Sequence, residues 1–295
     1  MFTIFYLIFF GILGAIFASF AVAQVWRLRA SQIANDKEEL SRKSNIKILK
    51  NIINKKDKVD RSRCLHCGYY LRWFDLVPIL SWIILRGKCR KCHKKIGYTE
   101  IVAEIFGFVI FSALFIIFNP IHGSHIDISL LSRIICLYII FIPLLILFIY
   151  DLKWSLLPTK ILWIFNILAF IYWCLGTYNQ QDILNIISNL TIAIIFFPIT
   201  YLILSLISKG KWVGDGDWIL ALGLVLLMPN LPIFTILLLL LSNIIGLLFI
   251  VILSLINRKK IKRGAQIPFG PAMILAALII ILSQGYIFQI LVSVY

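Results

Sequence analysis

Charged residues are scarce in this sequence, and their scarcity argues against an ordinary soluble domain. Asp, Glu, Lys and Arg together make up only 14% of the chain, and only 13 residues are acidic. A soluble domain carries about 25% charged and about 45–50% apolar residues, whereas 61% of this chain is hydrophobic. The composition therefore predicts an all-α polytopic membrane protein.

Long apolar segments recur along the chain and predict eight membrane-spanning helices. Such a helix needs about 20 apolar residues, and the sixth segment is shorter than that. The eight expected spans are Phe2–Val25, Ile101–Phe118, Ile128–Tyr150, Pro158–Leu175, Ile183–Ile207, Asp217–Met228, Ile233–Ile256 and Ile267–Val294.

Lys and Arg are absent from alternate connections between these segments. The connections 'NPIHGSHID', 'GTYNQQD' and 'PNLP' contain neither residue. Because basic loops face the cytoplasm, this alternation predicts that both termini lie outside. It also explains the net charge of +16, because Lys and Arg mark the cytoplasmic loops of a membrane protein. We therefore expect the lipid bilayer as a partner and no nucleic acid. The basic residues lie in 27–63, 86–95 and 258–263 and at Lys153, Lys160, Lys209 and Lys211.

The first apolar segment lacks the basic start and the small-residue cleavage site of a signal peptide. We therefore expect a retained helix over residues 1–26, a basic cytoplasmic loop over 27–100 and a seven-helix membrane domain over 101–295. Within the loop, residues 30–60 fit either a helix on the membrane surface or a solvated basic linker.

Four cysteines in this loop have the spacing of a zinc site. Cys64 and Cys67 form one CxxC pair, and Cys89 and Cys92 form a second about twenty residues later. Two such pairs supply a tetrahedral set of thiolates, which closes the site to substrate and predicts a structural zinc ion. The reducing cytoplasm disfavours disulfides between these cysteines. The alternative to a zinc site is a set of thiols that is redox-active or has no structural role. The neighbouring His66 and His93 are not needed as ligands.

Two aspartates stand at the cytoplasmic ends of expected spans. Asp151 ends the third span in 'FIYDLKWSLLP', and Asp217 opens the sixth after the glycine-rich turn 'GDGD'. Ionisable residues at a membrane boundary are costly and are candidates for function. A carboxyl pair that shares one proton can activate water for attack on a peptide carbonyl or can relay protons in a transporter. The residues alone do not separate these two activities.

Several motifs resemble those of the type IV prepilin peptidases, which are GxGD-type membrane aspartyl proteases. The stretch 'LVPILSWIILRGKCRKC' from Leu76 to Cys92 resembles the core of the family's cytoplasmic loop. Glu104 in 'IVAEIFG', Asp151 with Pro158 in 'DLKWSLLP', 'GDGD' and the 'FGP' that follows Ile267 are similar to further family motifs.

The resemblance implies an aspartic endopeptidase that removes the leader of prepilins or pseudopilins at the cytoplasmic face of the bacterial inner membrane. The implied catalytic pair is Asp151 and Asp217. Gly214 and Gly216 form the active-site turn, and Asp215 is a bystander at the variable position of GxGD. Many members of the family also methylate the new N-terminus with S-adenosylmethionine.

Three positions depart from the family pattern and leave this methylation open. Ala18 and Ala21 replace a glycine and an asparagine in the first span, and Ile219 stands where a lysine is frequent. Two other functions remain as alternatives. A proton-coupled transporter would show an internal repeat, which we do not find in the sequence. A zinc-stabilised membrane scaffold would need the cysteines but not the aspartates.

Overall fold

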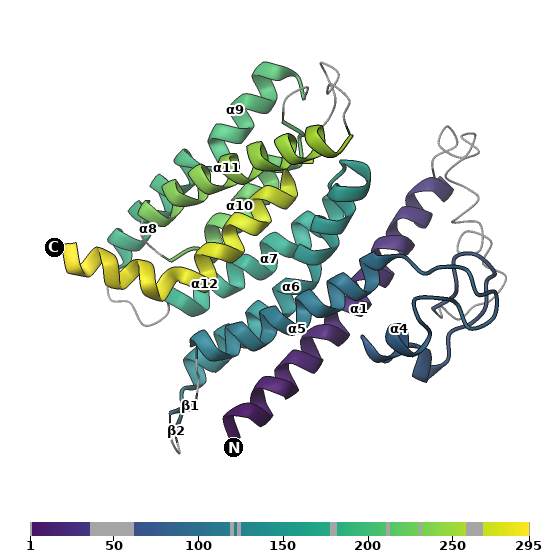
Figure 1. Ribbon diagram of the computed structural model, residues 1–295. Coiled ribbons are helices and arrows are strands. Elements are labelled where there is room, and N and C mark those ends of the chain that lie inside the picture. Colours follow the sequence, from purple (N-terminus) through teal and green to yellow (C-terminus); the bar gives the residue numbers. More distant parts are fainter. Residues whose placement is uncertain are drawn as a thin grey trace. The chain divides into compact units, whose positions relative to one another are not determined.

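The computed structural model describes residues 2–35, 62–118, 121–122, 125–177, 182–210, 213–229, 232–257 and 268–294. The chain divides into two compact units, Met1–Ile116 and Ile117–Tyr295. The described residues are almost entirely helical, apart from a short antiparallel pair, β1 (Ile121–His122) and β2 (His125–Ile126). This architecture confirms the predicted all-α polytopic fold (Figure 1).

Unit 1 contains two long apolar helices, α1 (Phe2–Asn35) and α5 (Tyr98–Phe118), on either side of the cysteine loop. The loop carries the 3-10 turn η1 (Trp73–Asp75) and the short helix α4 (Leu80–Ile84). The two long helices cross where both lack side chains. A Cβ on Gly14 would lie 2.2 Å from the carbonyl oxygen of Gly107, so only glycine permits this approach.

Helix α1 continues well beyond residue 26, where the apolar segment was expected to end. Ala30 and Ile33 are buried and pack with Trp26, and these residues lie on one helical face. This packing accounts for the extension of the helix to Asn35. Residues 36–61, which hold the rest of the expected surface helix or linker, lie outside the described part of the chain.

Unit 2 is a bundle around a short central helix. Helix α10 (Asp217–Leu227) packs against α7 (Thr159–Thr177), α8 (Ile183–Phe196), α9 (Pro198–Ser208) and α12 (Gly270–Val294). Helix α6 (Ile128–Trp154) packs against α7 and α12, and α11 (Pro232–Asn257) packs against α8 and α12.

The number of candidate spans depends on helix length. Six helical segments of the described chain are long and apolar enough to cross a membrane. The sixth expected span falls among the shorter apolar helices, as Asp217–Leu226. The eighth coincides with α12, which has 25 residues from Gly270 to Val294. The fifth expected span is interrupted between α8 and α9 at Phe197, because Pro198 cannot continue the backbone hydrogen bonding of a helix.

Candidate active site and metal centre

Asp151 lies in the last turn of α6, and only 4% of its surface is exposed. Ser155 ends this helix in a left-handed conformation, and its N–H donates to the carbonyl oxygen of Asp151 at 2.8 Å. The Asp151 carboxylate receives a backbone donor from far along the chain. Gly270, the first residue of α12, donates its N–H to Asp151 Oδ2 at 2.9 Å. The 'FGP' motif therefore holds one carboxylate oxygen in place.

Asp217 is the first residue of α10 and is 6% exposed. Its backbone N–H donates to the Gly214 carbonyl oxygen at 3.1 Å, and Gly214 N–H donates to Asp217 Oδ2 at 2.8 Å. These reciprocal bonds close the glycine turn over the start of the helix. A Cβ on Gly216 would lie 2.9 Å from Leu157 Cβ, so the turn packs tightly on the segment that follows α6.

The structure brings Asp151 and Asp217 into electrostatic contact within unit 2. Each carboxylate has one oxygen held by a backbone amide, which leaves its other oxygen available for a further partner. Asp215 is placed differently, because it is exposed and its Oδ1 accepts a hydrogen bond from Ser205 Oγ on α9 at 2.6 Å. Only the first two aspartates are thus both buried and located at helix ends that meet in the bundle.

Two residues near the pair were missed as site residues in the sequence. Gly270 had a signal in the 'FGP' motif, but its bond to Asp151 joins residues far apart in the chain. Tyr201 had no signal. It is buried on α9, interacts electrostatically with Asp217, and its hydroxyl lies 3.2 Å from Ser242 Oγ.

Replacement of Gly270 by alanine is expected to lower activity without unfolding the bundle. The added Cβ would lie 2.8 Å from Asp151 Oδ2, so the carboxylate has to move. A displacement of about 1 Å can cost about 100-fold in rate. The measurement is cleavage of a prepilin leader, the activity that the family resemblance implies, by Gly270→Ala, with Gly176→Ala near the end of α7 as the matched control. Cleavage by Gly270→Ala at the rate of the control would contradict this role for Gly270.

The four cysteines of unit 1 converge on one point. Their sulfur atoms all lie within 4.8 Å of one another, and the Cys64–Cys92 and Cys67–Cys89 sulfur pairs are each 3.9 Å apart. A tetrahedral zinc ion with Zn–S bonds of about 2.3 Å needs sulfurs about 3.8 Å apart. The thiols therefore fit a tetrahedral metal ion, and neither His66 nor His93 belongs to the cluster.

The backbone explains why both CxxC pairs point inward. In the first knuckle Gly68 N–H donates to the Cys64 carbonyl oxygen, and in the second His93 N–H donates to that of Cys89, both at 2.9 Å. Gly68 and His93 both have positive φ, 72° and 53°. His93 thus occupies the left-handed position that glycine fills in the other knuckle, which gives this histidine a backbone role.

The cluster also favours thiolate formation at one cysteine. Burial raises the pKa of the Cys64 thiol to about 12. At Cys89 burial raises the pKa as well, but hydrogen bonds from the Cys92 and Lys91 amides outweigh it, and the pKa falls to about 7. Because a metal ion binds thiolates, its binding displaces the remaining protons, and metal affinity is expected to rise with pH.

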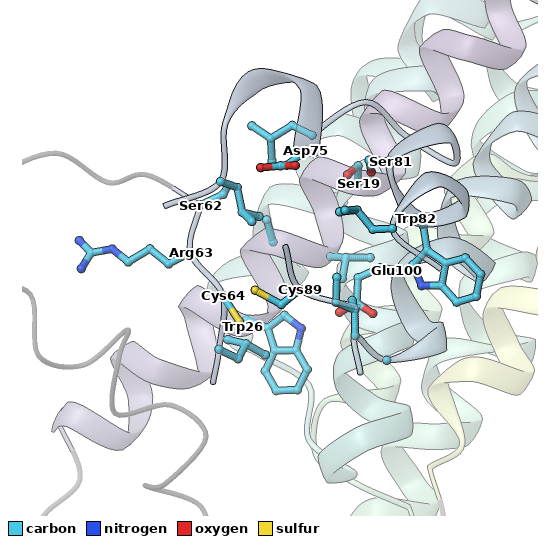
Figure 2. A pocket seen from close by; sticks show the side chains of 18 of the residues that line it. Ser19, Trp26, Ser62, Arg63, Cys64, Asp75, Ser81, Trp82, Cys89 and Glu100 are labelled. Atoms are coloured by element: carbon cyan, nitrogen blue, oxygen red, sulfur yellow. The ribbon is translucent and has the colours of Figure 1, made fainter. Parts of the chain in front are cut away.

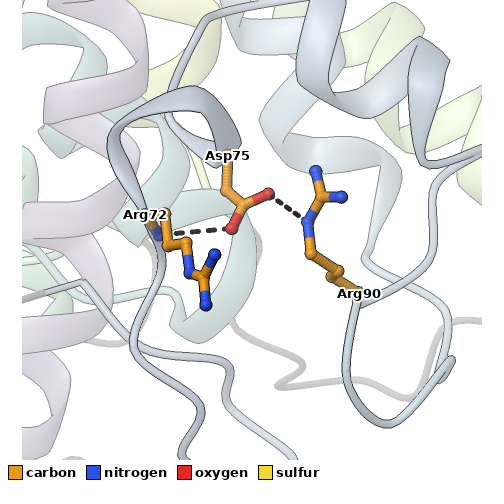
Figure 3. A network of polar contacts seen from close by, with 3 residues as sticks. All are labelled: Arg72, Asp75 and Arg90. Atoms are coloured by element: carbon orange, nitrogen blue, oxygen red, sulfur yellow. Dashed lines mark hydrogen bonds and ion pairs between the residues drawn. The ribbon is translucent and has the colours of Figure 1, made fainter.

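An ion pair between the exposed Arg90 and the buried Asp75 fixes the segment between the knuckles. Asp75 Oδ1 accepts a hydrogen bond from Arg90 Nε at 2.8 Å, and its Oδ2 accepts from the Arg72 N–H at 3.2 Å (Figure 3). Arg90 also lies over the Phe74 ring, 4.8 Å from its centroid. Since Arg90 belongs to the second knuckle, these contacts tie that knuckle to η1.

A cavity of about 430 Å³ lies within unit 1 between α1 and the cysteine loop (Figure 2). Trp26 and Trp82 contribute indole rings to its lining, and Glu100 and Glu104 contribute carboxylates. Among the described residues, the buried Trp82 Nε1–H has no hydrogen-bond partner. The lining thus combines aromatic surface, an unused donor and charges of both signs, because Arg27, Arg63, Arg90, Lys94 and Lys95 also belong to it.

The three departures from the family pattern occupy different places. Ala18 and Ala21 are fully buried on α1, and the Ala18 Cβ packs against Gly107 of α5. Ser19, between them, is hydrogen-bonded to Glu104. Ile219 lies on α10, where its carbonyl oxygen accepts a hydrogen bond from Asn166 Nδ2 at 3.0 Å. Two departures are therefore buried in the packing of α1 within unit 1, and the third lies two residues from Asp217.

Comparison with known proteins gives matches for both units. The family described as Bacterial Peptidase A24 N-terminal domain matches residues 12–118. A prepilin leader peptidase/N-methyltransferase of Vibrio cholerae is 30% identical over 283 residues, covering 94% of this chain and 97% of that protein.

Two further relatives are similar over most of their length. A prepilin leader peptidase/N-methyltransferase of Aeromonas hydrophila is 28% identical over 76% of this chain and 72% of its own length. An Escherichia coli protein, a type 4 prepilin-like proteins leader peptide-processing enzyme, is 27% identical over 92% of each chain. No solved structure matches the chain.

Proposed function

Because this chain belongs to the prepilin leader peptidase/N-methyltransferase family, we propose that it removes the leader from type IV prepilins or pseudopilins. The proposal assigns cleavage to Asp151 and Asp217. Its main support is the placement of two buried carboxyls that interact electrostatically, one near the end of α6 and one at the start of α10, each with one oxygen held by a backbone amide.

The chemistry follows from two carboxyls that share one proton. Like charges close together cannot both form easily, so one aspartate is ionised and the other is protonated. The ionised carboxylate accepts a proton from water as the water oxygen attacks the scissile carbonyl carbon. The protonated carboxyl donates to the carbonyl oxygen, and the resulting tetrahedral intermediate collapses when the leaving nitrogen is protonated. The backbone N–H of Gly270 holds one oxygen of Asp151, and the backbone N–H of Gly214 holds one oxygen of Asp217.

The site is assigned to the cytoplasmic face of the bacterial inner membrane, with both termini outside. Lys153 follows Asp151 closely, Lys160 begins α7, and Lys209 follows α9 near the glycine turn. Basic residues of this kind mark the cytoplasmic ends of spans. The leaders of prepilins or pseudopilins would reach the aspartates from that side.

The peptidase assignment is tested with the purified protein in lipid vesicles and a prepilin as substrate. We expect mass spectrometry to find a single new N-terminus directly after the glycine that ends the basic leader. A proton-coupled transporter or a zinc-stabilised scaffold would leave the prepilin intact. An uncut prepilin in the presence of correctly folded, zinc-loaded protein would overturn the proposed activity.

The four cysteines are assigned to one structural zinc ion. The spacing of their sulfur atoms supports this choice, and a closed set of four thiolates has no open position for substrate. The ion would join the two knuckles of the loop. Peptide cleavage would then depend on zinc only through the folding of unit 1.

A methyltransferase activity in the same chain would require S-adenosylmethionine. That cofactor supplies an electrophilic methyl group on a sulfonium cation, and the cavity of unit 1 is suited to it. Trp26 and Trp82 provide aromatic faces for the cation, and Trp82 Nε1–H offers a donor. Glu100 and Glu104 provide carboxylates in a lining that also contains five basic residues. This cavity is formed by residues other than the two aspartates.

Calorimetry with S-adenosylmethionine tests this assignment without reference to turnover. The parent protein is expected to bind it, and Trp82→Leu, which removes the indole, is expected to weaken binding about tenfold or more. Asp217→Asn should bind like the parent. Binding by Trp82→Leu equal to that of the parent would exclude this cavity, and absence of binding by the parent would argue that the departures at Ala18, Ala21 and Ile219 accompany a loss of methylation.

A further inference from the structure

The short helix α4 presents an apolar face that no other described residue of unit 1 covers. Leu80, Ile83 and Ile84 are 58%, 55% and 74% exposed, and Trp73 in the preceding η1 turn is 78% exposed. Large apolar side chains gathered in this way mark a surface that binds a partner or a membrane. The loop is otherwise strongly basic, so this face is a local feature of one segment.

Hydrogen bonds fix the position of this segment along the lengths of the two long helices, α1 and α5. Ile79, directly before α4, donates its N–H to Glu104 Oε2 at 2.7 Å. Glu104 lies six residues, or about 9 Å, inside α5, which begins at Tyr98. The same carboxylate is hydrogen-bonded to Ser19 of α1, six residues before the end of the expected span at Val25. In Figure 1, α4 accordingly lies beside the middle of α1 and not beyond its end.

The backbone of this segment is fixed and satisfied internally. Ile79 has φ 63° and ψ −54°, and Leu80 N–H donates to the Pro78 carbonyl oxygen at 2.6 Å. These values describe a strained γ-turn, which is unusual for a β-branched residue. The Ser81 and Ile83 N–H groups donate to carbonyl oxygens of the same segment. Irregular backbone near lipid requires such pairing.

Basic side chains flank the apolar segment in sequence. Arg72 precedes η1, and Arg86 and Lys88 follow α4, all exposed, while the acidic side chain of Asp75 is buried in its ion pair with Arg90. A short apolar segment flanked by exposed cations matches the boundary between acyl chains and anionic headgroups.

We propose that the segment Pro78–Leu85 is a membrane anchor that inserts Leu80, Ile83 and Ile84 into the cytoplasmic leaflet. The occupant of this apolar face is lipid. The buried Glu104 carboxylate positions the anchor by holding the Ile79 turn at the level of the membrane-spanning helices. The zinc knuckles that flank the anchor in sequence would then be held against the membrane surface.

Photo-crosslinking in vesicles tests the proposal on the full chain. The photoreactive residue p-benzoyl-phenylalanine replaces Ile84, and in a matched variant it replaces Lys91, which is exposed within the second knuckle. Both proteins are reconstituted in vesicles of phosphatidylethanolamine and phosphatidylglycerol, and their zinc content is compared with the parent to establish folding. We expect lipid adducts on the variant with the photoreactive residue at position 84 and no lipid adducts on the variant with it at position 91.

Other products would overturn the proposal. Adducts between residue 84 and another part of the chain, or a second copy, would show that protein covers the α4 face. Equal lipid labelling at both positions would show that the whole loop contacts lipid without a dedicated anchor. A lack of any adduct at residue 84, with labelling elsewhere in the same vesicles, would place α4 in water.

Discussion

Cys89→Ser is expected to lose zinc and to unfold the cysteine loop of unit 1. Cys89 is 3% exposed, and its sulfur lies 3.9 Å from that of Cys67. Structural zinc sites in small domains contribute an apparent free energy of about 10–16 kcal/mol, and the loop has little other core. Metal analysis should fall from about one zinc ion per chain to background, and limited proteolysis should cut between residues 62 and 97.

A cysteine outside the cluster provides the control for this result. Cys174 is exposed on α7 and is not part of the cluster, so Cys174→Ser should keep the zinc content and the protease resistance of the parent. Retention of both properties by Cys89→Ser would show that the four thiols do not hold a structural ion. Chelation of zinc from the parent should reproduce the proteolysis pattern of Cys89→Ser.

Asp151→Asn and Asp217→Asn are each expected to lower leader cleavage by at least about 10³-fold, because each removes an acid or base that acts in the transition state. Asparagine keeps the size of the side chain, and its oxygen can still accept the backbone bond from Gly270 or Gly214. The bundle should therefore remain folded. Single-turnover cleavage of a prepilin in vesicles measures the effect.

Asp215 supplies a matched control two residues from Asp217. It is exposed and bonded to Ser205, so Asp215→Asn should cleave within about threefold of the parent, as surface changes usually have small effects. Equal losses for Asp215→Asn and Asp217→Asn would indicate that the whole turn, and not one carboxyl, is required.

The cysteine cluster and the order of the helices could be predicted because both are encoded locally. Two CxxC pairs need only their spacing to indicate a metal site, and apolar length indicates a span. The interruption at Phe197 also had a local signal in Pro198. The extension of α1 to Asn35 had a weaker local signal in the sequence, since Ala30 and Ile33 are buried by packing with Trp26.

The environment of the aspartates could not be predicted in this way. The bond from Gly270 to Asp151 joins α12 to α6, and the bond from Asn166 to the Ile219 carbonyl joins α7 to α10. Neither follows from periodicity or from the neighbours of a residue in sequence. The same holds for Tyr201, whose position near Asp217 results from the packing of α9 against α10.

We expect Asp151 and Asp217 to perform cleavage and not merely to hold the fold or the substrate. Prepilin binding and leader cleavage, measured on the same preparation of Asp217→Asn, separate these roles. We predict binding equal to that of the parent and no detectable cleavage. Cleavage by this variant at the rate of the parent would contradict the assignment of Asp217 to the catalytic pair.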